Sequence, residues 1–202
     1  MDRIRGIRKL TDNRFLNLYA MDVTFRDGSQ GTYYEASRRR EVSQLRAVTH
    51  DSQPDGVVIC GVWGEAQNRV VLIRQFRYPL NGYVYEFPAG LVEPGETLVS
   101  AGVREMYEET GLTLAPVDAG DYSRPFFTTV GMTDECCGMV FGRCAGQPTN
   151  SHQEGSEDIQ VVLADRAECA RILKEENVAI MCAYMLMHFV SGEGDPLKFL
   201  NH

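Results

Sequence analysis

The N-terminal quarter of the chain contains a largely apolar run, a turn signal and a second short run, a pattern that predicts a β-hairpin. Residues 15–25 have the composition of a strand, Asp27-Gly28-Ser29 is a turn signal, and residues 31–36 can return as the partner strand. An isolated hairpin is marginal in water, so this one is expected to pack on another surface. The charged residues 1–13 predict an irregular arm. Together these segments form an N-terminal region over residues 1–48.

Residues 49–202 carry the pattern of a larger core in which strands alternate with helices. The apolar runs 56–63 and 69–76 are rich in valine and isoleucine and predict two buried strands. Further strands are predicted at residues 83–87, 137–144 and 159–163, and helices at residues 165–175 and 178–190. The last helix is apolar nearly all round, so it is expected to be buried against the sheet or another subunit.

One stretch, residues 90–112, combines turn, helix and stop signals with a dense cluster of charges. Pro94-Gly95 marks a turn, and the following residues contain no proline until Pro116. Gly111 can end a helix because glycine adopts the left-handed conformation at little cost. The pattern therefore predicts a loop over residues 90–96 and a helix near residues 97–110.

Three glutamates of this predicted helix converge on one side. Glu105, Glu108 and Glu109 are spaced i, i+3 and i+4, a spacing at which like charges destabilise a helix by about 0.2–0.5 kcal/mol per pair. Arg104 is predicted to point about 100° away from Glu105 and to offset only part of this charge. A divalent cation such as Mg²⁺, which prefers oxygen ligands, is the natural counter-charge. In an arbitrary helix such a cluster is more often a solvated face.

The whole stretch matches a more specific pattern. At every defined position it fits Gly-x5-Glu-x7-Arg-Glu-U-x-Glu-Glu-x-Gly-U, where U is a bulky aliphatic residue and Met106 and Leu112 fill the two U positions. That pattern is the signature of the Nudix hydrolases, which this chain resembles. The resemblance implies an α/β fold, the Nudix α/β/α sandwich with a mixed sheet, to which the small N-terminal hairpin region would be added.

A second phrase narrows the resemblance. Residues 74–79 read Arg-Gln-Phe-Arg-Tyr-Pro and residues 86–90 read Glu-Phe-Pro-Ala-Gly, as in the branch that includes ADP-ribose pyrophosphatases and nucleoside diphosphate sugar hydrolases. In that branch the last arginine of the first phrase lies against the substrate, which assigns this role to Arg77 and, more weakly, to Arg74. Thr129-Val130-Gly131 stands where the branch usually carries a Ser-Pro-Gly-like phrase, so the exact substrate stays open.

The resemblance also implies the roles of the site residues. The metal, Mg²⁺ with Mn²⁺ as the alternative, would be held by the backbone carbonyl of Ala89 and by the carboxylates of Glu96, Glu105, Glu108 and Glu109. Glu96 would support the metal site, and Arg104 would fix the orientation of one glutamate of the Nudix signature, called the box below. The catalytic base is assigned to Glu157, with Glu154 as runner-up, on a loop before the strand at residues 159–163. The simpler interpretation of these two acids is solvated loop charge.

These assignments predict metal-dependent hydrolysis of the diphosphate linkage of ADP-ribose or a related nucleoside diphosphate sugar. The products would be AMP, or another nucleoside monophosphate, and a sugar phosphate. Two alternatives stay open: a Nudix hydrolase of UDP- or GDP-sugars, and a nucleotide sensor of the same fold without turnover. A sensor is expected to lose box carboxylates, whereas this chain keeps all four.

Composition constrains the partners and the compartment. The formal net charge is −8 and the chain has no basic block beyond Arg38–Arg40, which argues against nucleic acid as the main partner. The six cysteines show no zinc-ligand spacing, the N-terminus lacks the apolar core of a signal peptide, and the longest apolar stretch is too short to span a bilayer. We therefore expect a cytoplasmic protein with no membrane partner, and the resemblance implies a homodimer formed through the N-terminal strands.

Overall fold

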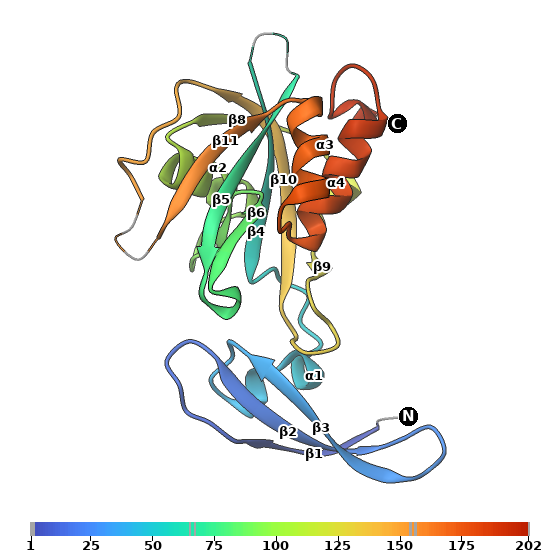
Figure 1. Ribbon diagram of the computed structural model, residues 1–202. Coiled ribbons are helices and arrows are strands. Elements are labelled where there is room, and N and C mark those ends of the chain that lie inside the picture. The colour runs from blue at the N-terminus through green and yellow to red at the C-terminus, as the bar shows by residue number, and fades with distance from the viewer. Residues whose placement is uncertain (1–2, 65, 67, 154, 156, 202) are drawn as a thin grey trace. The chain divides into compact units, whose positions relative to one another are not determined.

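The computed structural model describes residues 3–64, 66, 68–153, 155 and 157–201 (Figure 1). These described residues divide into two compact units. The first combines the chain up to Asp55 with Pro125–Cys137, and the second combines Gly56–Arg124 with the chain from Gly138 onward. The division between residues 48 and 49 stays a prediction; segment 125–137, which lies within the predicted core, belongs to the first unit.

The first unit is built on an antiparallel sheet of order β1-β2-β3. Its strands are β1 Ile4–Lys9, β2 Asn17–Thr24 and β3 Gln30–Ser37. The predicted hairpin of β2 and β3 is confirmed, with Gly28 at φ 86° in its turn. The prediction of an irregular arm at the N-terminus is wrong. The charged residues form β1, because its backbone pairs with β2 and its Arg8 forms an ion pair with Asp22.

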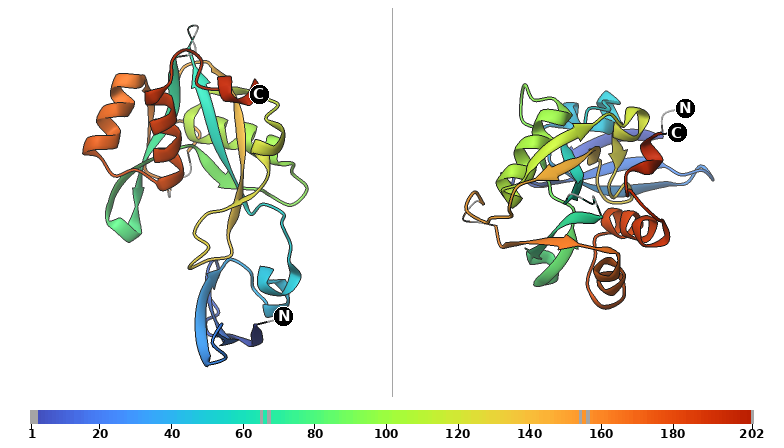
Figure 2. Two further views of the ribbon diagram at one scale, coloured as in Figure 1. Left: turned by 90° about the vertical axis from the view of Figure 1, so that its right-hand side faces the viewer. Right: turned by 90° about the horizontal axis from the view of Figure 1, so that it is seen from above.

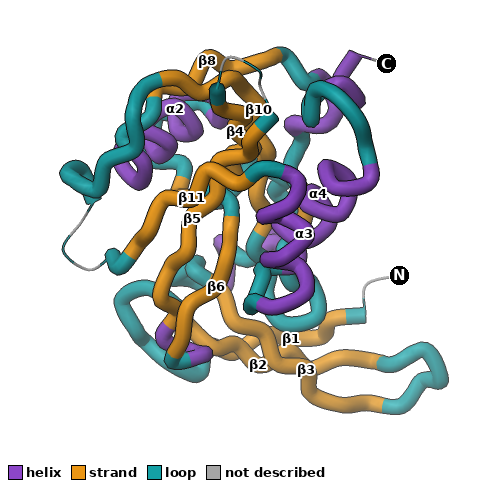
Figure 3. The backbone as a smooth tube through the Cα atoms, turned by 45° about the horizontal axis from the view of Figure 1, so that its top comes forward, coloured by secondary structure: helices purple, strands orange, loops and turns teal. Residues whose placement is uncertain are grey.

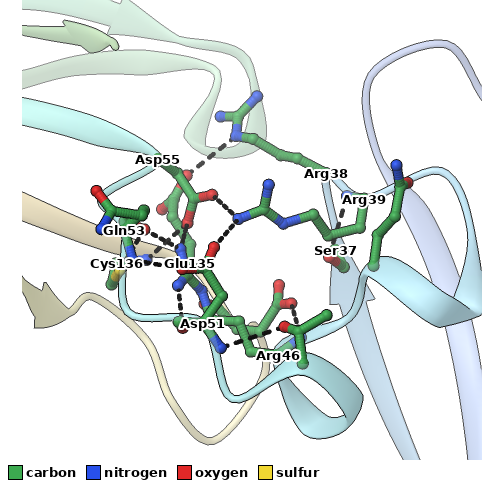
Figure 4. Close-up of polar contacts among 12 residues, drawn as sticks. Ser37, Arg38, Arg39, Arg46, Asp51, Gln53, Asp55, Glu135 and Cys136 are labelled. Carbon is green, nitrogen blue, oxygen red and sulfur yellow. Dashed lines mark hydrogen bonds and ion pairs between the residues drawn. The ribbon is translucent and has the colours of Figure 1, made fainter. Parts of the chain in front are cut away.

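A buried arginine organises the rest of the first unit (Figure 4). Arg46, at the start of the short helix α1 Arg46–Thr49, is only 6% exposed. It donates to the backbone carbonyls of Asp51, Gln53 and Asp134 and to the carboxylate of Asp55 at 2.7 Å. Segments distant in sequence are therefore joined through one guanidinium group. The remaining elements of this unit are the 3₁₀ turn η1 Val42–Gln44 and the strand β9 Phe126–Phe127.

The second unit contains the main sheet, whose path is β11-β5-β4-β10-β8, with β6 paired to β5 and β7 to β4. The strands are β4 Gly56–Trp63, β5 Arg69–Arg77, β6 Gly82–Glu86, β7 Ala89–Leu91, β8 Thr113–Val117, β10 Cys136–Ala145 and β11 Ile159–Ala164. All five strands predicted for the core are confirmed. The short strands β7 and β8 were not expected from the sequence.

Helices cover both faces of this sheet, as the view from above shows (Figure 2). Helix α2 Leu98–Thr110 lies on one face, and α3 Arg166–Glu175 and α4 Ile180–Ser191 lie on the other. Met106 of α2 packs in one buried cluster with Val57 and Ile59 of β4. The 3₁₀ turns are η2 Tyr78–Leu80, η3 Gly120–Ser123 and η4 Lys198–Asn201. The tube view shows helices on both sides of the strands of this unit (Figure 3).

Helix α4 is buried on one face only. Cys182 and Leu186 are buried, whereas Ile180, Tyr184 and Met187 are each more than half exposed. The prediction of burial against the sheet therefore holds for one side of this helix. Within the described residues, no helix combines the length and the hydropathy needed to cross a membrane.

Candidate active site

Helix α2 begins and ends where its local sequence predicts. Thr97 caps its N-terminus, since its Oγ1 accepts from the amide of Ser100 at 3.1 Å, and the hydroxyl of Ser100 accepts from the amide of Thr97 at 2.9 Å. Gly111, at φ 72°, ends the helix. Burial of Ala101 and Met106 fixes the rotation of the helix about its own axis. That rotation decides which glutamates face inward.

Arg104 is the centre of the acidic cluster. Its guanidinium donates to both carboxylate oxygens of Glu96 at 2.8 and 2.9 Å, to Glu105 at 2.8 Å and to Glu108 at 2.9 Å. A fifth bond reaches the carbonyl of Leu91 at 3.0 Å. The expectation that Arg104 points away from Glu105 is wrong, because its long side chain curves back across the helix surface. These bonds hold the pKa of Glu96 down to about 2.

Glu109 lies inside the protein and Glu108 does not. Glu109 is only 4% exposed and accepts a hydrogen bond from the amide of Ala89 at 3.1 Å, whereas the side chain of Glu108 is 46% exposed. Burial raises the pKa of Glu109 to about 9, and the carboxylates of Glu105 and Glu157 act in the same direction. Burial also raises the pKa of Glu105. Burial therefore favours the protonated form of both Glu105 and Glu109.

A cleft of about 540 Å³ opens beside α2. Its lining residues are Ala89, Gly90, Leu91, Glu93, Arg104, Glu105, Glu108, His152 and Glu157. Glu157, which is far from α2 in the sequence, thus shares a cavity with Glu105 and Glu108. Glu154 lies outside the described residues. Glu93 and His152 were not identified from the sequence, which offers no motif for either.

The two candidate substrate-binding arginines point in different directions. They are three residues apart on β5, so they lie on opposite faces of the sheet. Arg77 is held by Glu86 through two bonds of 3.0 and 2.6 Å, and the nearby carboxylates of Glu109 and Glu157 help to raise its pKa. Arg74 instead lies 4.0 Å from the centre of the Tyr83 ring. The structure therefore brings Arg77, but not Arg74, to the acidic cluster.

The donor chemistry of the cleft fits a hard divalent cation. Glu105 and Glu108 offer carboxylate oxygens beside the backbone of Ala89 and Gly90, and Mg²⁺ prefers such ligands. No group of three ligating side chains is arranged for a metal within the described part of the chain. Arg104 hydrogen-bonds Glu105 and Glu108, two of the carboxylates that a cation would use.

Comparison with known proteins decides the family. The family model of the NUDIX domain matches residues 52–180. The chain belongs to the Nudix family. A putative nudix hydrolase 2 from Caenorhabditis elegans is 30% identical over 149 residues, which cover 70% of this chain and 66% of that protein. An ADP-ribose pyrophosphatase from Bacillus subtilis is 30% identical over 130 residues, which cover 63% and 58%. This Nudix protein thus spans less than two thirds of the length of these relatives.

The fold also matches that of a solved structure. The crystal structure of a protein named ADP compounds hydrolase superposes with a TM-score of 0.66 at 16% identity and covers 95% of both chains. The predicted Nudix α/β fold, with its N-terminal strands preceding a main sheet between helices, is therefore confirmed. The predicted resemblance to ADP-ribose pyrophosphatases is confirmed at the level of distant homology.

Proposed function

We propose that this Nudix hydrolase cleaves the diphosphate linkage of ADP-ribose or a related nucleoside diphosphate sugar, with Mg²⁺ or Mn²⁺ as cofactor. The products are AMP, or the corresponding nucleoside monophosphate, and a sugar phosphate. The observation that carries the proposal is the cleft shared by Glu105, Glu108 and Glu157. Relatives named ADP-ribose pyrophosphatase in Bacillus subtilis and Saccharomyces cerevisiae support the substrate class.

The metal would be held by Glu105, Glu108 and Glu109 with the carbonyl of Ala89, and Glu96 would support this set through Arg104. A bound ion would supply positive charge to offset that of the diphosphate and would make the attacking water more acidic. Arg104 keeps the carboxylates of Glu105 and Glu108 in fixed orientations through its hydrogen bonds. The chain itself therefore contributes carboxylate and carbonyl oxygens, which would still have to move together around a bound ion.

Glu157 accepts the proton of the attacking water. The water oxygen forms a bond to one phosphorus, the bridging P–O bond breaks, and the two halves leave as monophosphates. Arg77 binds a phosphate oxygen, and its two bonds to Glu86 hold the plane of the guanidinium for that contact. The base and the cation-binding glutamates Glu105 and Glu108 thus line the same cleft, where the attacking water would lie.

A homodimer formed through the first unit is part of the proposal. Phe15, Tyr33 and Tyr34 are each more than 40% exposed in that unit. Exposed aromatic side chains of this size are typical of interfaces. Sedimentation or light scattering of the wild-type protein, compared with Tyr34→Glu, tests this part.

The decisive experiment is product analysis with Mg²⁺ on ADP-ribose, UDP-glucose, GDP-mannose, NADH and diadenosine polyphosphates. Preferential release of AMP from ADP-ribose is the expected result. Preferential cleavage of a UDP- or GDP-sugar would keep the mechanism and replace the substrate. Tight binding of one compound without turnover of any would favour a nucleotide sensor and contradict the proposal. Glu157→Gln should slow turnover with little loss of metal binding; an effect of Glu154→Gln alone would move the base to that residue.

A further inference from the structure

Asp158, the residue that follows Glu157, is fixed to the β5–β6 hairpin by two bonds. The hydroxyl of Tyr83 donates to its carboxylate at 2.6 Å, and its backbone carbonyl accepts from the amide of Phe76 at 3.0 Å. The next residue, Ile159, begins β11 in register with Gln75 of β5. The chain immediately after Glu157 is therefore held by both side chain and backbone.

Tyr83 is itself held firmly in place. Its ring meets Phe76 edge to face, with centroids 5.5 Å apart, and the guanidinium of Arg74 lies 4.0 Å from its centre. Arg74 in turn donates to Gln160 of β11 at 3.3 Å. These contacts restrict the Tyr83 ring, so that its hydroxyl can hold the Asp158 carboxylate in one orientation. This arrangement also gives Arg74 a role away from the acidic cleft.

The other end of the same segment is tied to helix α2. The amide of Thr149 donates to the carbonyl of Thr110 at 2.9 Å, and Gln153 donates to the carbonyl of Glu109 at 2.8 Å. His152 stacks on Tyr107, with ring centroids 4.6 Å apart and planes 29° apart. Glu157 therefore lies on a segment attached at one end to the metal-binding helix and at the other to the β5–β6 hairpin.

We propose that Tyr83 is a positioning residue that sets Glu157 within the cleft by holding Asp158. The proposal rests on the proposed function, in which Glu157 is the catalytic base. A hydrogen bond to an ionised carboxylate is stronger and shorter than a neutral one, so the 2.6 Å bond restrains the adjacent residue effectively. Proton transfer depends steeply on the placement of the base, and a displacement of about 1 Å can cost about a hundredfold in rate.

The test compares Tyr83→Phe with Tyr78→Phe. Both tyrosines meet Phe76 edge to face, at 5.5 and 5.4 Å, but Tyr78 is 81% exposed, and among the described residues only the Tyr83 hydroxyl donates to the Asp158 carboxylate. With the best diphosphate substrate, Tyr83→Phe is expected to lower kcat by about tenfold and to change KM by less than about twofold. Tyr78→Phe should match the wild type. Tyr78→Phe should unfold at the wild-type temperature, and Tyr83→Phe should stay folded with a small fall in that temperature, because it loses one hydrogen bond.

Two further variants separate positioning from a purely structural role. In a Glu157→Gln background, Tyr83→Phe should cause no further fall in kcat, because both changes act on the same base. Asp158→Asn keeps an oxygen that accepts from Tyr83 and should retain more activity than Asp158→Ala. Independent, additive losses from Tyr83→Phe and Glu157→Gln would overturn the proposal, as would wild-type kcat in Tyr83→Phe.

Hydrogen exchange of the peptide covering residues 146–158 gives a readout that needs no turnover. Tyr83→Phe is expected to speed exchange there relative to Tyr78→Phe, and unchanged exchange would overturn the inference whatever the activity. Suppose that the wild-type protein cleaves no substrate but that Tyr83→Phe still speeds exchange in residues 146–158. That result would contradict the proposed function and would support the restraint of Asp158 by Tyr83. If the wild-type protein is active and Glu157→Gln has the same kcat, only the assignment of Glu157 as the base is contradicted.

Discussion

The carboxyl group of Glu105 lies directly against the backbone of Gly90. A Cβ atom placed on Gly90 would stand 1.9 Å from the Cδ atom of Glu105, far closer than two carbon atoms can approach. The first glycine of the box is therefore needed for space, since its φ is not in the left-handed region. This contact places Glu105 beside the backbone carbonyl of Ala89, which is proposed to bind the same metal ion.

Gly90→Ala should therefore displace Glu105 and disrupt the metal site. We expect kcat to fall by about a hundredfold and the Mg²⁺ concentration needed for half-maximal rate to rise. The matched control is Gly131→Ala, where an added Cβ meets nothing within 4 Å. Steady-state kinetics over a Mg²⁺ series checks this. Wild-type Mg²⁺ dependence in Gly90→Ala would mean that Glu105 is not a ligand.

Arg104 and Arg171 each hold several carboxylates, but of the two only Arg104 lines the cleft. Arg104 binds Glu96, Glu105 and Glu108, and Arg171 of α3 binds Glu168 and Glu176. Arg104→Gln should lower both kcat and the unfolding temperature, because it releases the glutamates that are proposed to bind metal. Arg171→Gln should lower the unfolding temperature alone. Equal effects of the two variants on kcat would contradict an orienting role for Arg104.

Glu109→Gln should abolish turnover and leave the fold intact. The glutamine keeps an oxygen that accepts from the Ala89 amide, so the local structure survives, but it cannot become the anionic ligand that a cation would require. We expect kcat to fall by at least about a hundredfold, and Mg²⁺ to raise the unfolding temperature less than in the wild type. Calorimetry with and without Mg²⁺ gives the second readout. An unaffected rate would remove Glu109 from the metal site.

The buried Arg46 should dominate the stability of the first unit. Arg46→Ala leaves the Asp55 carboxylate and three backbone carbonyls short of a donor and should cost about 3–5 kcal/mol. Arg38, whose pair with Glu135 is 48% and 31% exposed, is the control, and Arg38→Ala should cost at most about 1 kcal/mol. Urea unfolding should be followed by circular dichroism rather than by tryptophan fluorescence. The single tryptophan, Trp63, belongs to the second unit, so its fluorescence would not report directly on the first. Similar costs for both variants would contradict the prediction.

Glu35 should make the protein less stable as the pH rises. Burial raises its pKa from 4.5 to about 7, Asp134 adds to the shift, and its Oε1 has no hydrogen-bond partner within the described residues. Between these two values the folded state binds more protons than the unfolded state, so stability falls as the pH rises from 4.5 to about 7. Glu35→Gln should therefore raise the unfolding temperature at pH values above 7 and have little effect below 4.5. Glu193→Gln, at an exposed position, is the control, and a gain independent of pH would contradict a titrating Glu35 as the cause.

Local signals in the sequence were sufficient to predict most elements of secondary structure. The limits of α2 follow from Thr97 and Gly111, because capping depends on residues next to each other in the chain. The hairpin of β2 and β3 follows in the same way from strand-forming residues on either side of a turn signal. Strand β1 was missed because its charged residues carry no apolar alternation, and only pairing with β2 makes it a strand.

The sequence by itself determined the family, the helix that carries the acidic box and the chemical types of the candidate site residues, since all of these depend on identity and spacing along the chain. Only the tertiary structure decided how those residues meet. It buried Glu109, exposed Glu108, turned Arg104 back onto Glu105 and separated Arg77 from Arg74. The burial of Glu109, its bond from the Ala89 amide and the meeting of Glu157 with Glu105 in one cleft depend on contacts between residues far apart in the sequence, which no local pattern encodes.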